Sequence, residues 1–155
     1  MHISKNALHF VKAFGFGIVV LMIWLTANRS PKPAQYANSQ LKVTGNFIGG
    51  KAEGAWTWWY MSGKKMSEGV FVDGVRKGPW TTWYSDGTKK SEAIYEQDML
   101  NGKYTMWHAN GKLKFIGNYQ SDQLDGIQQY YDTLGRLKEE RIFEKGEEVH
   151  TSLNN

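Results

Sequence analysis

Residues 78–97 read GPWTTWYSDGTKKSEAIYEQ, and the same pattern returns at a fixed step along the chain. A glycine opens the unit, aromatic residues follow it, an x-Gly dipeptide interrupts it, and another aromatic residue comes near its end. Self-similarity at a fixed period is the signature of a repeat protein. Four series keep a step of 24 residues without an insertion: Gly54, Gly78, Gly102 and Gly126; Gly63, Gly87, Gly111 and Gly135; Trp59, Trp83, Trp107 and Tyr131; and Phe71, Tyr95, Tyr119 and Phe143.

Each copy of the repeat predicts a β-hairpin. The first half is rich in Trp, Tyr and Thr, which favour strands. The dipeptide Asp86-Gly87 then favours a two-residue type I′ turn, and a looser turn such as Gln97-Asp98 leads into the next copy. The predicted fold is all-β, a single-layer antiparallel meander of repeated hairpins, with four copies and a partial one in residues 45–149.

A two-residue turn decides which residues face each other. In the copy that begins at Gly78, the numbers of paired residues add up to 173, so Trp80 faces Ala93. The same rule sets Trp56 against Gly69 one copy earlier, so that an aromatic ring meets a small residue each time. A ring over a small residue shields a weak position of the sheet.

The last copy is predicted to cap the repeat sheet. Its second strand lies within residues 136–149, RLKEERIFEKGEEV, and is dense in charged side chains. Charge at an edge discourages the pairing of a further strand. We therefore expect this strand to form the edge of the sheet, followed by a short tail at residues 150–155.

The charge of the chain is divided unevenly. Residues 1–40 hold four basic and no acidic residues, which leaves 15 basic and 15 acidic residues for positions 41–155. A nucleic-acid binder needs a basic stripe, so we expect no nucleic-acid partner. The absence of Cys excludes disulfides, thiolate zinc sites, cysteine nucleophiles and an acylated lipoprotein anchor.

The N-terminal part of the chain predicts a membrane segment. Residues 13–27, AFGFGIVVLMIWLTA, carry no charge, and the run covers residues 8–27 if the Lys12 ammonium reaches the headgroups. Such a run fits either a transmembrane helix or the core of a signal peptide. Because no A-x-A cleavage pattern follows it, we favour an uncleaved anchor at residues 1–27 over secretion after signal cleavage.

This anchor predicts a location as well. A short leading tail usually stays in the cytoplasm, so residues 28–155 are expected on the outer side of the cytoplasmic membrane, periplasmic or extracellular, in a single-pass protein. Residues 28–44 are polar with two prolines and are predicted to be a semi-extended linker to the repeats.

Residues that carry catalytic chemistry are scarce. His2, His9 and His150 lie outside the predicted repeats, and His108 occupies a position held by Tyr60 and Tyr84 in sister copies. No nucleophile elbow, phosphate-binding loop or zinc-protease motif occurs. We therefore predict no enzyme activity, no catalytic residues, no metal site and no cofactor.

The repeat unit resembles the MORN-repeat variant family, a bacterial branch of the membrane occupation and recognition nexus repeats. The likeness covers residues 45–149 and rests on the Gly-x-Trp opening, the x-Gly turn and the late aromatic residue, as in GAWTWWYMSGKKMSEGVFVDG and GKYTMWHANGKLKFIGNYQSD. The resemblance implies an elongated, twisted antiparallel sheet that acts in interaction or scaffolding. Some family members are antitoxin-like or membrane-associated, and none shares catalytic residues with the others.

A binding function follows from these patterns. The aromatic ladder of Trp59, Trp83, Trp107 and Tyr131 predicts an apolar strip for an unidentified protein partner at the cell envelope. The alternatives are an antitoxin-like role, or binding of a cell-wall polymer or lipid headgroup. The polymer alternative arises because GAWTWWYMSGKKM also resembles choline-binding repeats, whose aromatic cages attract quaternary ammonium groups.

Overall fold

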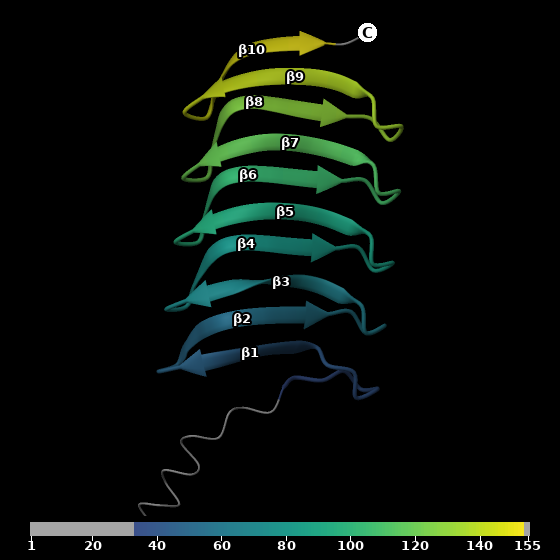
Figure 1. Cartoon of the computed structure of the whole chain (residues 1–155), viewed down its shortest axis with the longest axis vertical. Coiled ribbons are helices and arrows are strands. Elements are labelled where there is room, and N and C mark those ends of the chain that lie inside the picture. The colour runs from purple at the N-terminus through teal and green to yellow at the C-terminus, as the bar shows by residue number, and fades with distance from the viewer. Residues whose placement is uncertain (1–32, 154–155) are drawn as a thin grey trace, which may run out of the picture. The chain divides into compact units, whose positions relative to one another are not determined.

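The computed structural model describes residues 33–153, which form one open antiparallel sheet of ten strands. Each strand pairs with the strands before and after it in the chain, so the order in space is the order in sequence (Figure 1). The predicted all-β meander is therefore confirmed, whereas the predicted N-terminal helix lies outside the described residues. The strands are β1 (Val43–Ile48), β2 (Lys51–Trp59), β3 (Lys65–Val72), β4 (Val75–Trp83), β5 (Lys89–Glu96), β6 (Met99–Trp107), β7 (Leu113–Gln120), β8 (Gln123–Tyr131), β9 (Leu137–Glu144) and β10 (Glu147–Leu153).

The predicted pairing register is confirmed. Trp80 pairs with Ala93 between β4 and β5, and Trp56 pairs with Gly69 between β2 and β3. The same relation holds in the third and fourth copies. The chain therefore repeats one hairpin in one register.

The turn that was expected to set this register is different. Between β4 and β5, the backbone N–H of Gly87 donates to the carbonyl of Tyr84 at 2.9 Å, and the N–H of Tyr84 donates to the carbonyl of Thr88 at 2.8 Å. Gly87 has a φ of 93°, but Asp86 is not in the left-handed region. These are the marks of a three-residue loop that ends in a left-handed glycine, so the prediction of a two-residue type I′ turn here was wrong.

A β-bulge compensates for the extra loop residue. Trp83 pairs with Lys89, but the next pair is Thr82 with Ser91, so Lys90 has no partner across the hairpin. The loop and the bulge shift the pairing by one residue in opposite directions. The register was therefore predicted correctly from an incorrect turn.

The two-residue type I′ turns occur at the other end of the hairpins, where looser turns were expected. Val72 pairs directly with Val75, and the intervening Asp73 and Gly74 have φ of 53° and 88°. Positive φ at both central residues defines a type I′ turn. In Figure 1 these tight turns lie on the left of the sheet, where the odd-numbered strands end, and the three-residue loops lie on the right.

A second irregularity bends every hairpin onto its predecessor. Glu68 pairs with Thr81 and Val70 pairs with Lys77, which leaves residues 78–80 opposite Gly69 alone. A methyl group added at Gly69 would overlap the indole of Trp80, so the ring lies directly over this glycine.

The aromatic residue thus covers the small residue of the preceding strand, and not that of its own hairpin as expected. Trp56 lies over Gly45 in the same way, and Gln128 lies over Gly117. Trp80 Nε1 donates to the carbonyl of Val70 at 3.3 Å, and Gln128 Nε2 donates to the equivalent carbonyl of Asn118 at 3.1 Å. Gln128 therefore replaces the indole N–H in the last copy.

The ends of the sheet differ from expectation. β10 pairs with the charged strand β9, so β9 is not an edge and residues 150–153 belong to a strand. At the other end, Tyr36 and Gln40 close a loop like those of the repeats, with the N–H of Tyr36 donating to the Gln40 carbonyl at 2.8 Å. The described part of the expected linker, residues 33–44, is therefore folded against the sheet.

Candidate functional site

The two faces of the sheet have different compositions. One face, here called the aromatic face, packs its rings against one another, as Phe71 does against Trp80 with ring centroids 5.1 Å apart. The other, here called the polar face, carries a row that crosses the strands and alternates Thr with Glu in its first five positions. The members of this row are Thr57, Glu68, Thr81, Glu92, Thr105, Ile116, Gln129 and Glu140.

The aromatic face is the more buried side of the sheet. Trp56 and Trp80 are each only 9% exposed, and Phe115 and Phe143 are also buried. A single-layer sheet has no second layer to cover it, so its rings must exclude water by packing along the sheet. This face holds the hairpins together.

The predicted structural residues occupy three kinds of place. The glycines of the first series lie within the bulges over the preceding strand, and those of the second series close the three-residue loops. The late aromatic residues pack on the aromatic face. In order, these are Gly54, Gly78, Gly102 and Gly126; Gly63, Gly87, Gly111 and Gly135; and Phe71, Tyr95, Tyr119 and Phe143.

The predicted partner-binding ladder lies on the polar face, next to the three-residue loops. Its members are half-buried. The Lys65 ammonium lies 5.6 Å from the centre of the Trp83 ring, and the Lys89 ammonium lies 5.3 Å from that of Trp107. Side chains from the intervening strands thus separate the rings, so the ladder is not a bare aromatic strip. The ladder consists of Trp59, Trp83, Trp107 and Tyr131, paired with Lys65, Lys89, Leu113 and Leu137.

The lysines over the rings also neutralise the glutamates of the polar face. Lys65 Nζ lies 2.6 Å from a carboxylate oxygen of Glu68, and Lys89 Nζ lies 2.5 Å from one of Glu92. Each lysine therefore contacts both an indole and a carboxylate. The polar face presents balanced charge beside its apolar groups.

A hydrogen bond at each loop ties consecutive copies together. The Tyr60 hydroxyl donates to the carbonyl of Trp83 at 2.8 Å, and the Tyr84 hydroxyl donates to that of Trp107 at 2.9 Å. His108 occupies the same position, with Nε2 3.0 Å from the carbonyl of Tyr131. In its Nε2–H tautomer the histidine donates the same bond, so it serves the repeat as the tyrosines do.

The last copy ends this series. Asp132 stands at the position of Tyr60, and its carboxylate accepts the backbone N–H of Arg136 at 2.9 Å and that of Leu134 at 2.8 Å. These hydrogen bonds, the first of them above all, hold the pKa of Asp132 below its usual value. The side chain is satisfied within its own loop, so this loop needs no further copy.

Four apolar side chains of the polar face form a second row, which the sequence analysis did not identify. Val70 is 38% exposed and Ile94 is 42% exposed, and Pro79 and Ala55 are exposed as well. Ala55 pairs with Val70 and Pro79 pairs with Ile94, so the four residues lie on the neighbouring strands β2 to β5. We call Ala55, Val70, Pro79 and Ile94 the aliphatic row.

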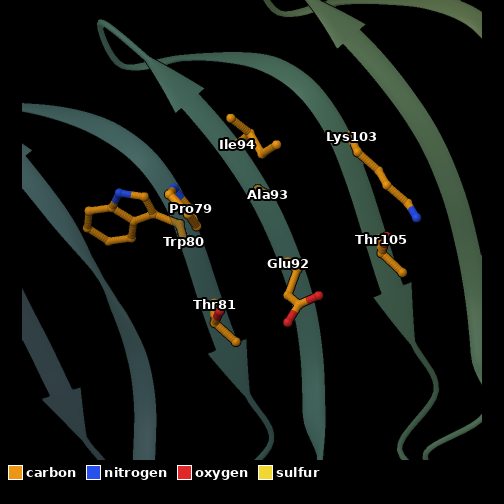
Figure 2. Close-up of a pocket in the computed structure, with 8 residues that line it drawn as sticks. All are labelled: Pro79, Trp80, Thr81, Glu92, Ala93, Ile94, Lys103 and Thr105. Carbon is orange, nitrogen blue, oxygen red and sulfur yellow. The ribbon is translucent and has the colours of Figure 1, made fainter.

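The aliphatic row borders a shallow hollow of about 340 Å³. Figure 2 shows the side chains of Thr81, Glu92 and Ile94 in this region, with Lys103 on the next strand and Trp80 projecting away from them. The hollow combines hydroxyl groups, one carboxylate, one ammonium group and aliphatic surface. It offers contacts to a ligand without enclosing it.

Within residues 33–153, no group of three His, Asp or Glu side chains is placed to hold a metal ion. The same residues include no helix of the length and hydropathy that a membrane span requires. The largest buried polar side chain, Gln128, serves the packing of the sheet.

Comparison with known proteins supports the recognition of the repeat. The model of the MORN repeat variant family matches this chain twice, at residues 76–97 and 100–121. The two segments each cover most of one repeat of the sheet, so these copies are MORN repeat variants. This family suggests a repeat module for interaction with proteins or membranes. Among curated proteins, no sequence matches the chain.

Proposed function

We propose that this protein, two of whose copies are MORN repeat variants, is a non-enzymatic scaffold that binds a protein partner on the polar face of its sheet. The aliphatic row carries this proposal. Apolar side chains gathered on one exposed face usually mark a contact surface. The binding surface is centred on Val70 and Ile94, with the Thr and Glu row beside them.

The composition of this surface suits a protein partner. Protein interfaces combine an apolar centre with a polar rim, and the rim supplies hydrogen bonds that set orientation. Val70 and Ile94 form the centre, while Thr81, Glu92 and Lys103 lie around it. Because Glu92 is already paired with Lys89, the surface has no strong charge of one sign to attract a polyanion.

The aromatic ladder lies beside this surface. Trp59, Trp83, Trp107 and Tyr131 lie on the same face as the aliphatic row but are half-buried. We propose that they stiffen the polar face and contribute to the rim of the interface. A partner would reach them after displacing exposed lysine side chains such as Lys65 and Lys89.

Anchoring at the cytoplasmic membrane is part of the proposal. The uncharged run of residues 8–27 supports it, and residues 28–155 would then lie on the outer side. A sheet tethered in this way would present its polar face to other envelope proteins. Fractionation of cells, followed by protease treatment of intact cells and of spheroplasts, tests both the anchor and the side of the membrane.

Capture of partners from detergent extracts tests the binding surface. We expect the Val70→Asp/Ile94→Asp double variant to retain about tenfold less of any partner that the wild-type chain enriches, because two carboxylates would be desolvated at the centre of the interface. Leu134→Asp is the matched control, since Leu134 is 59% exposed in a loop of the last copy. Equal capture by the double variant and the control contradicts the proposal.

Binding to purified cell-wall polymer distinguishes the polymer alternative. Saturable binding of purified cell-wall polymer, lost when Trp59, Trp83 and Trp107 are replaced by Ala, would support a polymer-binding module. In that case the ladder, and not the aliphatic row, is the functional surface.

A further inference from the structure

We infer that a hollow on the aromatic face, in the C-terminal half of the sheet, is a binding site for a small planar aromatic acid. The hollow has a volume of about 320 Å³. Small-molecule sites in proteins usually begin at about this size and are lined by apolar and aromatic side chains. Its lining includes Tyr104, Met106, Phe115, Tyr119, Tyr130 and Lys114. We call it the tyrosine hollow.

The tyrosine hollow lies where the third copy has smaller residues than the first. Trp58 packs against Trp56 and Trp80 in the first copies, with ring centroids 5.7 and 5.6 Å away. In the third copy the positions of Trp56 and Trp58 are held by Tyr104 and Met106. The sheet continues with the same register, so the volume that Trp56 and Trp58 fill in the first copy is left open here.

The remaining rings form the walls of a flat site. Phe115 lies 5.9 Å from Tyr104 and 5.1 Å from Tyr130 by ring centroids, and Tyr119 lies 5.8 Å from Tyr104. These tilted and edge-to-face contacts leave ring surfaces on which another aromatic ring can pack. A planar aromatic ligand therefore replaces the missing indole.

Hydroxyl groups at the walls supply donors for an oxygen-bearing ligand. Within residues 33–153, the hydroxyls of Tyr119 and Tyr130 donate to no other group of the protein. Burial raises the pKa of Tyr119 and of Tyr130, so both phenols keep their protons at neutral pH. Both therefore remain hydrogen-bond donors.

The charge around the tyrosine hollow selects an anion. Lys114 lines it, and the guanidinium of Arg141 lies 5.4 Å from the centre of the Tyr130 ring. No carboxylate is among its lining residues, whereas Arg141 is paired with Glu139 at 2.8 Å and with Glu148 at 3.4 Å and so adds no net positive charge. Aromatic walls alone would also attract an organic cation, but the Lys114 ammonium in the lining opposes one.

The site is separate from the aliphatic row, although Tyr131 of the aromatic ladder also lines it. The tyrosine hollow opens on the aromatic face, whereas the aliphatic row lies on the polar face. A ligand in the hollow and a protein on the aliphatic row would not compete for the same side chains. Failure of one proposal therefore leaves the other unaffected.

Titration of the full chain with 2-naphthoate tests the inference, with calorimetry and the methyl resonance of Met106 as readouts. We expect saturable binding that shifts this resonance, and weaker binding of the neutral amide of the same ring. Lys114→Gln should lower the affinity about fivefold, as expected for loss of a partly exposed ion pair. Lys90→Gln is the matched control, because Lys90 holds the same repeat position but does not line the hollow.

A filling variant keeps the test independent of charge. Met106→Trp restores the residue of the first copy, so it should reduce binding more than tenfold while the circular dichroism of the sheet is kept. The inference is overturned if the folded wild-type chain binds no 2-naphthoate, if Lys90→Gln and Lys114→Gln weaken binding equally, or if phenyltrimethylammonium binds more tightly than 2-naphthoate.

Discussion

The aromatic face and the polar face belong to the same strands, yet they place their apolar groups in opposite ways. Trp80 on the aromatic face is 9% exposed and lies over a glycine of the preceding strand. Ile94 on the polar face is 42% exposed, one strand away. A sheet without a second layer can therefore bury one side by bending each hairpin onto the preceding one. Its other side then stays available for binding.

The largest difference in stability should appear between two truncations, one on each face. Trp80→Ala removes a buried indole that contacts Phe71 and Tyr95, so we expect a loss of about 3–5 kcal/mol in the free energy of unfolding. Ile94→Ala should cost about 0.5 kcal/mol or less, because its side chain is already largely in water. Urea denaturation of both variants measures the contrast, and equal losses would contradict the division of roles.

The glycine under the indole provides a sharper test of the same face. Gly69→Ala should destabilise the sheet by about 1–3 kcal/mol, because the methyl group overlaps the Trp80 ring. Ala93 already lies opposite Tyr104 one copy later, so Trp80→Tyr should partly rescue Gly69→Ala. A double-mutant cycle measures this coupling, and strict additivity would show that the ring does not lie over the glycine.

The aromatic ladder should give an intermediate effect. Trp83 is half-buried and lies beside the Lys65 ammonium, so we expect Trp83→Ala to cost about 1–2 kcal/mol. Thermal unfolding measures this value against that of Trp80→Ala. A cost as large as that of Trp80→Ala would mean that both faces are cores.

The smallest effect is the pH dependence of stability that an ion pair at one tight turn contributes. The Arg76 guanidinium donates to Asp98 at 2.8 Å, and its backbone N–H donates at 2.9 Å, so the pKa of Asp98 lies below its usual value. A carboxylate with a lowered folded-state pKa stabilises the fold above its unfolded-state pKa of about 3.9, and this contribution is lost as pH falls through the folded-state value. Asp98→Asn should therefore reduce the decrease in the free energy of unfolding below about pH 4. The reduction should be less than about 1 kcal/mol, because the pair is partly exposed. An unchanged acid profile would show that this pair contributes nothing to the turn.

The period of 24 residues was enough to predict the fold, because a repeat without insertions must place equivalent residues in equivalent strands. The turns were harder to predict. Asp86-Gly87 favours a type I′ turn locally, but the β-bulge at Lys90 permits a longer loop without a change of register. The type I′ turns were missed because their sequences differ between copies. Asp73-Gly74 carries the usual signal, whereas Gln97-Asp98, with φ angles of 50° and 67°, contains no glycine.

The proposed binding surface was predicted only in part. The step of 24 residues between Val70 and Ile94 was visible in the sequence, but their exposure depends on a bulge that the pattern did not reveal. The regular series of Trp59, Trp83 and Trp107 drew attention to aromatic residues whose exposure the interleaved side chains reduce. The proposed anchor at residues 1–27 lies outside the described residues and stays a prediction.

Photo-cross-linking from the two faces tests the central claim most directly. A benzophenone amino acid placed at Ile94 reports on the polar face, and one at Phe47, which is 49% exposed, reports on the aromatic face. Irradiation of intact cells should yield a discrete protein adduct from position 94 and none from position 47. An adduct from position 47 alone would contradict the assignment of the polar face as the partner surface.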